Sequence, residues 1–154
     1  MEDIFKDEKF EKFLYGGVRD LEEPVGQLIY NLWKAGITTE WSCSGHIGKT
    51  IGPSEKLAID GHYVYDAGRL YYKTTPNSEP LKSKLIEICT KHSFATLTER
   101  EGDSKFILEM KDIALHCSER GYTELQVPIQ LAERRYAEFL EIWRELTDWS
   151  KIIK

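Results

Sequence analysis

The sequence predicts a single α+β domain over residues 1–154, with a mainly antiparallel sheet, helices packed on one side and a long C-terminal helix. Three observations lead to this prediction. Four segments carry apolar residues on one helical face. Short β-branched and aromatic runs between residues 37 and 110 alternate with turn residues. The length and the ordinary apolar content suit one domain with a substantial core.

Two helices are expected first. Apolar residues among charges predict an amphipathic helix over residues 4–15. Asp20 then offers an N-cap, and apolar residues at steps of three and four continue as far as Trp33, where Gly36 provides the stop. The segment 37–41 that follows is β-branched and aromatic, which predicts a strand.

Strands and one helix fill the middle of the chain. After a Gly-, Ser- and Lys-rich loop over residues 44–56, two or three antiparallel strands are expected between residues 57 and 72. Residues 76–78 begin the next helix, which has an apolar face of Leu81, Leu85, Ile88 and Cys89. Two further strands are predicted at residues 94–99 and 105–110.

Pro128 precedes the last helix. Its bulky residues recur at alternating steps of three and four, broken only by Ser150, at Ile129, Ala132, Tyr136, Phe139, Trp143, Leu146 and Ile153. We expect this apolar seam to pack within the chain, and a homodimer interface through the C-terminal helix is the alternative.

Charge and cysteine usage narrow the class of protein. A formal net charge of −5 argues against a nonspecific nucleic-acid binder, although one basic face for RNA is compatible with it. Cys43, Cys89 and Cys117 are odd in number and lack CxxC spacing, which indicates a reducing compartment. No apolar run reaches membrane-spanning length. We therefore expect a soluble, cytoplasmic protein without a membrane partner.

The most informative segment is Thr38–His46, where a predicted strand runs into a turn of small polar residues. The turn holds two hydroxyls, one thiol and one imidazole at Ser42, Cys43, Ser44 and His46, with Gly45 between the last two. Such residues fill cores poorly, and scaffolds often present sites where strands end. A solvated turn with one buried cysteine is the alternative interpretation.

Three chemistries could use residues of this turn. Cys43, His46 and His62 could bind zinc with Asp60 as a fourth ligand or as a hydrogen-bond partner, but a second ligand pair is missing, and we expect no metal. A Cys43 nucleophile activated by His46 is a second alternative. Residues 45–50 resemble the end of a phosphate-binding loop, yet Cys43 stands where its first glycine is required, which argues against an NTPase.

At Ser42–Ile47 the chain resembles the third wybutosine-synthesizing protein family. These S-adenosylmethionine-dependent enzymes methylate a ring nitrogen of the tricyclic tRNA guanosine beside the phenylalanine anticodon. The family's motif is Ser-Cys-Ser-Gly-Arg-Ile, and here His46 replaces its arginine, which would bind a carboxylate or phosphate bidentately. Residues 84–94 and 125–129 are similar to the family in placement, so that the resemblance covers most of the chain.

The resemblance implies S-adenosylmethionine as cofactor and tRNA or a nucleoside as partner. The cofactor would be held by Ser42, Cys43, Ser44 and Gly45. His46 or Asp60 would accept the proton from the methylated nitrogen. The substrate would be bound by Thr39, His62, Tyr63 and Tyr65.

The tyrosines of the predicted hairpin add a further expectation. Tyr63, Tyr65, Tyr71 and Tyr72 could form one aromatic face for stacking a base, with cross-strand core pairs as the alternative. The alternative functions are a non-catalytic ligand-binding or homo-oligomeric interaction module and, less favoured, a small zinc hydrolase.

Overall fold

The structure, a computed structural model, describes residues 6–14, 22–48, 62–119 and 122–153. Its helices are α2 (Glu8–Phe13), α3 (Glu23–Lys34), the short 3-10 helix η2 (Pro76–Ser78), α4 (Glu79–Lys91) and α5 (Ile129–Ser150). Its strands are β1 (Thr39–Cys43), β2 (His46–Ile47), β3 (His62–Asp66), β4 (Gly68–Lys73), β5 (Ala95–Arg100), β6 (Asp103–Leu108), β7 (Leu115–Glu119) and β8 (Tyr122–Pro128).

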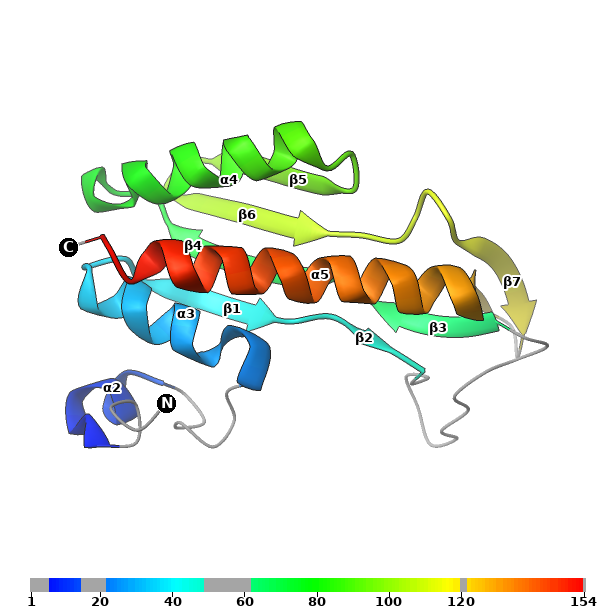
Figure 1. Cartoon of the computed structure of the whole chain (residues 1–154), viewed down its shortest axis with the longest axis horizontal. Coiled ribbons are helices and arrows are strands. Elements are labelled where there is room, and N and C mark those ends of the chain that lie inside the picture. Colours follow the sequence, from blue (N-terminus) through cyan, green and yellow to red (C-terminus); the bar gives the residue numbers. More distant parts are fainter. Residues whose placement is uncertain (1–5, 15–21, 49–61, 120–121, 154) are drawn as a thin grey trace.

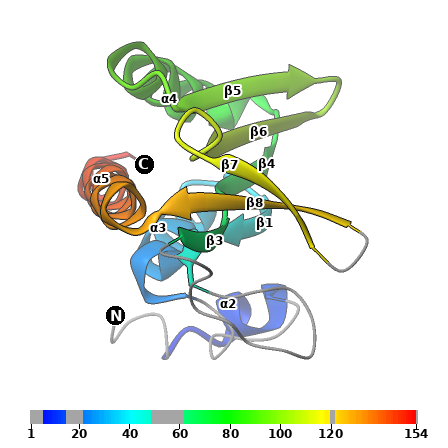
Figure 2. The same ribbon diagram turned by 90° about the vertical axis from the view of Figure 1, so that its right-hand side faces the viewer.

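The α+β class and the long C-terminal helix are confirmed, and the strands divide into two sheets. Both sheets are four-stranded and antiparallel, with orders β1-β4-β6-β5 and β2-β3-β8-β7 (Figure 1 and Figure 2). The second sheet was not predicted, because β2 lies inside the expected loop 44–56 and no strand was expected over residues 115–128, although Thr123, Leu125 and Val127 alternate there with Glu124 and Gln126. A strand of two residues is too short to show a period in the sequence.

The two sheets are joined by one long ribbon of two strands. Only Ser44 and Gly45 separate β1 from β2, and only Ala67 separates β3 from β4. The pairs Cys43↔Arg69 and His46↔Asp66 keep one register on both sides of this break. β1 and β2 are edge strands of their sheets, and together they form one edge of the ribbon. Ser44 and Gly45 of the polar turn break the strand structure along this edge.

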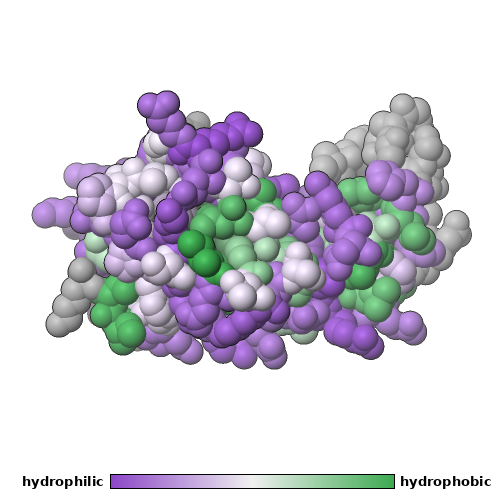
Figure 3. All heavy atoms as spheres, turned by 90° about the horizontal axis from the view of Figure 1, so that it is seen from above, coloured by the Kyte–Doolittle hydropathy of each residue, from purple (hydrophilic) through white to green (hydrophobic). Residues whose placement is uncertain are grey.

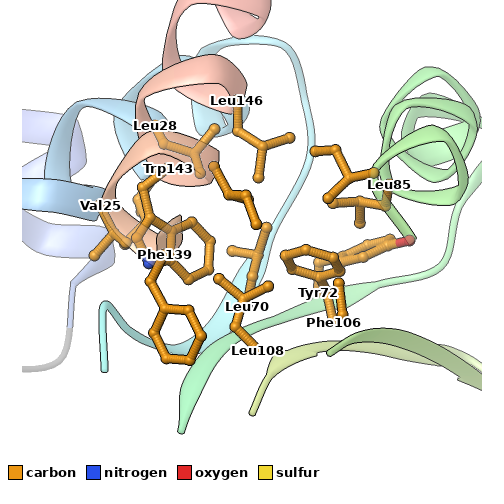
Figure 4. Packing of buried hydrophobic residues seen from close by; sticks show 14 of the residues in the cluster. Val25, Leu28, Leu70, Tyr72, Leu85, Phe106, Leu108, Phe139, Trp143 and Leu146 are labelled. Carbon is orange, nitrogen blue, oxygen red and sulfur yellow. The ribbon is translucent and has the colours of Figure 1, made fainter. Parts of the chain in front are cut away.

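The core lies between the strands and the helices. Figure 2 shows α4 and α5 on the same side of the strands, as predicted. Fully buried side chains from α3, α4, α5, β4 and β6 meet there, among them Leu28, Leu85, Phe139, Trp143, Leu146, Leu70, Tyr72, Phe106 and Leu108 (Figure 4). Burial of each leucine or phenylalanine among them stabilises the fold by about 1.5–3 kcal/mol.

The apolar seam of the C-terminal helix therefore packs within the chain. Phe139, Trp143 and Leu146 are fully buried. Tyr136 is partly buried and packs against the same core. The homodimer through this helix stays a prediction.

Two local predictions were wrong. Helix α3 takes Glu22 as its N-cap rather than Asp20, which lies outside the described residues, and Pro24 occupies its first turn. Proline is favoured there because the first N–H groups of a helix have no partner within it. Tyr72 cannot share an aromatic face with Tyr71, because it is fully buried in the core.

The surface seen from the side of α4 is mainly hydrophilic, with smaller apolar areas between the polar side chains (Figure 3). Among the residues that the structure describes, no helix combines the length and the apolar character needed to cross a membrane. The cellular compartment stays a prediction.

Candidate functional site

The polar turn is held by a carboxylate that arrives from helix α3. Glu22 does not cap its own helix with its side chain. Instead, the Ser44 N–H donates to Glu22 Oε1 at 3.1 Å and the Ser44 hydroxyl to Glu22 Oε2 at 3.2 Å. His46 Nε2 lies 2.8 Å from the same Oε2. Glu22 thus satisfies a backbone donor at the ribbon edge, where strand pairing ends.

Cys43 completes a compact group. Its thiol, the Glu22 carboxylate and the His46 imidazole offer atoms that all lie within 4.8 Å of one another. Burial raises the pKa of the half-buried Cys43 thiol from 9.0 to about 11, and Glu22 adds to the rise while the Gly45 backbone and Arg69 oppose it. The thiol is therefore protonated at neutral pH, which weighs against the activated nucleophile.

The break in the strand is anchored to helix α5. Gly45 has φ +94°, and a Cβ added there would lie 3.0 Å from the Phe139 ring and 3.2 Å from the backbone nitrogen of Gly68. The indole Nε1–H of Trp143 donates to the Ser44 carbonyl oxygen at 2.9 Å. Both the backbone conformation and the lack of space therefore require glycine at position 45.

A groove of about 320 Å³ lies on the sheet face away from the helices, beside the turn. Asp66 and Arg69, the cross-strand partners of His46 and Cys43, both line it. Further charged and aromatic lining residues are Tyr65, Tyr71, Glu109 and Lys111. Burial, followed by the charge of Glu109, raises the pKa of Tyr65 to about 12, so its phenol is neutral.

Aromatic and cationic side chains continue from the groove along β1, β4 and β6. Trp41 is 57% exposed, the Arg69 guanidinium lies 5.2 Å from its ring centre, and the Tyr71 ring meets it edge-on at 5.7 Å. Lys105 Nζ lies 5.1 Å from the Tyr71 ring centre. We call Trp41, Arg69, Tyr71 and Lys105 the open face, since the residues that alternate with them in β4 and β6 point into the core.

The structure brings only part of the predicted site together. Cys43, Ser44, Gly45 and His46 lie at the turn, Ser42 precedes them in β1, and Tyr65 lines the groove.

Other predicted residues lie further away or cannot be placed. His62 is four residues along β3 from the partner of His46, roughly 13 Å at strand spacing, and Thr39 is equally far along β1 from Cys43. Tyr63 pairs with Val127. The grouping of Cys43, His46 and His62 that was considered for zinc is therefore not formed. Asp60 lies outside the described residues.

The sequence did not predict Trp41, Arg69 and Lys105 of the open face as site residues, nor Glu22 at the turn. In the sequence Glu22 belongs to an acidic first helical turn, a common position for acidic residues because of the helix dipole. It lies about twenty residues from the polar turn, and no local spacing connects the two. Only the packing of α3 against the ribbon brings them together.

No protein-family model, curated protein or solved structure matches this chain. The resemblance at Ser42–Ile47 therefore stays a prediction.

Proposed function

We propose that this protein binds single-stranded RNA on the open face, with bases stacked on Trp41 and Tyr71 and phosphates contacted by Arg69 and Lys105. The observation that carries the proposal is the exposed Trp41 with a guanidinium and a second aromatic ring beside it. Stacking platforms combined with cations are the common means of binding single strands.

The charges of the open face favour a phosphate backbone. Among the described residues, neither Arg69 nor Lys105 has a carboxylate within ion-pair distance, and both lie over aromatic rings instead. Lys73, by contrast, is paired with Glu40 at 2.6 Å and with Asp103 at 3.2 Å. Two cations thus remain available for phosphates although the whole chain is acidic.

The groove suits a base that leaves the stack. Its walls offer the neutral phenol of Tyr65 and the carboxylates of Asp66 and Glu109. These groups can form hydrogen bonds with the donor and acceptor edge of a nucleobase. RNA rather than DNA is the partner that the resemblance implies.

The cofactor that the resemblance implies is a separate matter. Ser44 and Gly45 are buried, and the N–H and hydroxyl of Ser44 are already bonded to Glu22. S-adenosylmethionine would bind these groups only if Glu22 released them. The turn as it stands does not fit the cofactor, and the proposal is for RNA binding alone.

Fluorescence anisotropy with a labelled single-stranded RNA of about ten nucleotides tests the proposal. Stacking of one base is worth about 1–3 kcal/mol, so Trp41→Ala should raise Kd by roughly 5- to 150-fold. Arg69→Gln should reduce the slope of log K against log salt by about 0.7 for each phosphate that the variant no longer neutralises.

Ile86→Ala is the matched control, because Ile86 is a large exposed apolar residue on α4, away from the open face. It should bind RNA as the wild type does. Equal Kd values for Trp41→Ala and Ile86→Ala, or binding that salt does not weaken, would contradict the proposal.

A further inference from the structure

We propose that Glu22, Cys43 and His46 form a binding site for a zinc ion. The three residues offer an oxygen, a sulfur and a nitrogen within 4.8 Å of one another. Zinc accepts these three kinds of ligand, and it is the metal for which mixed thiolate and imidazole ligands are typical. The inference does not depend on RNA binding, since the zinc ligands would be Glu22, Cys43 and His46 alone, although Cys43 is the cross-strand partner of Arg69.

The distance between Glu22 and His46 suits a tetrahedral ion after a small adjustment, and the Cys43 sulfur, within 4.8 Å of both, would move in to the same spacing. Zinc bonds of about 2.0–2.3 Å at tetrahedral angles place neighbouring ligand atoms roughly 3.3–3.5 Å apart. Glu22 Oε2 and His46 Nε2 are 2.8 Å apart, so they must separate by about half an ångström. Their side chains are 27% and 40% exposed, which leaves room for this rotation and for the ion to enter.

The surroundings hold the proposed ligands in place. Ser44 donates its N–H and its hydroxyl to the Glu22 carboxylate, and Trp143 fixes the Ser44 carbonyl oxygen from the core. Hydrogen bonds of this kind orient metal ligands and sustain metal affinity. The positive φ of Gly45 turns the backbone so that the side chains of Cys43 and His46 both lie close to the Glu22 carboxylate.

The charge balance also favours a divalent cation. Glu22 and a Cys43 thiolate would together neutralise Zn²⁺, while His46 is a neutral ligand. Binding forms the zinc–sulfur bond and releases the thiol proton to solvent. Three protein ligands leave a fourth position for water, which is the arrangement of catalytic rather than structural zinc sites.

Titration of the chelator-treated full chain with Co²⁺ and Zn²⁺ tests the site. We expect one equivalent of Co²⁺ with a near-ultraviolet sulfur-to-cobalt charge-transfer band, which Zn²⁺ displaces. Cys43→Ser should abolish the band. Glu22→Gln and His46→Ala should each lower the affinity for the metal by roughly 10- to 100-fold or more. Loss of a residue that only hydrogen-bonds to a metal ligand already has an effect of this size.

Cys89→Ser and His92→Ala are the matched controls, since they remove a thiol and an imidazole outside the group. Both should bind the metal as the wild type does. Circular dichroism reports whether each variant is folded. His46→Ala should leave the core intact, because the His46 side chain is partly exposed. Absence of stoichiometric metal binding in the wild type, or an unchanged band in Cys43→Ser, would overturn the proposal.

Discussion

Trp143 connects the hydrophobic core to the polar turn, so its replacement should show how far the core supports the site. The side chain is fully buried, meets Phe106 edge-on at 6.0 Å between ring centres, and donates to the Ser44 carbonyl oxygen at 2.9 Å. Trp143→Phe keeps an aromatic ring but removes the N–H. The buried carbonyl then loses this donor, which should cost about 1–3 kcal/mol of the free energy of unfolding.

Trp143→Ala removes the packing as well. Replacing a fully buried tryptophan by alanine should cost about 3–5 kcal/mol. Urea denaturation followed by circular dichroism measures both variants, and each kcal/mol corresponds to roughly 2–4 °C in Tm for a chain of this size. Sedimentation reports whether the oligomeric state changes with them.

Trp149→Phe is the matched control on the same helix, because Trp149 is only partly buried. It should change stability much less. A Trp143→Phe variant as stable as the wild type would refute the role of the hydrogen bond. A folded Trp143→Ala variant with unchanged stability but reduced mass would mean that the seam is a dimer contact rather than core.

Three further predictions concern the turn itself. Gly45→Ala should destabilise the chain by at least about 1–2 kcal/mol in urea denaturation, because φ is +94° and Phe139 lies 3.0 Å from the added Cβ; an unchanged midpoint would contradict this backbone conformation. The pKa of Cys43 predicts that the rate of its alkylation by iodoacetamide is half-maximal at about pH 11 in the folded chain and near pH 9.0 in the unfolded chain, as peptide mass spectrometry can measure. Because the folded chain keeps this proton while the unfolded chain loses it, the contribution of Cys43 to stability should fall between these two pH values, and a midpoint near 9 in the folded chain would refute the burial. Because Glu22 already occupies the N–H and the hydroxyl of Ser44, S-adenosylmethionine at millimolar concentration should leave Tm unchanged; a dose-dependent rise in Tm would show that the folded chain binds the cofactor that the resemblance implies.

Much of the fold could be predicted because its longer elements have clear periods. The spacing from Val25 to Trp33 corresponds to α3, and the apolar face of α4 and the seam of α5 lie in the core as expected. Tyrosine placement was less predictable. Tyr71 and Tyr72 are neighbours on β4, so their side chains must point to opposite faces of the sheet. Tyr72 lies in the core, and Tyr71 lies on the open face.

The amino-acid sequence by itself determined the α+β class, the helices and the concentration of polar groups at Ser42–His46. These follow from local properties: periodicity, turn residues and side-chain chemistry. Only the tertiary structure decided how the strands divide into two sheets and which carboxylate reaches the turn. Glu22 meets Cys43 and His46 because the packing of α3 against α5 and β1 places its N-cap beside the ribbon edge, and contacts between residues so distant in sequence leave no local pattern.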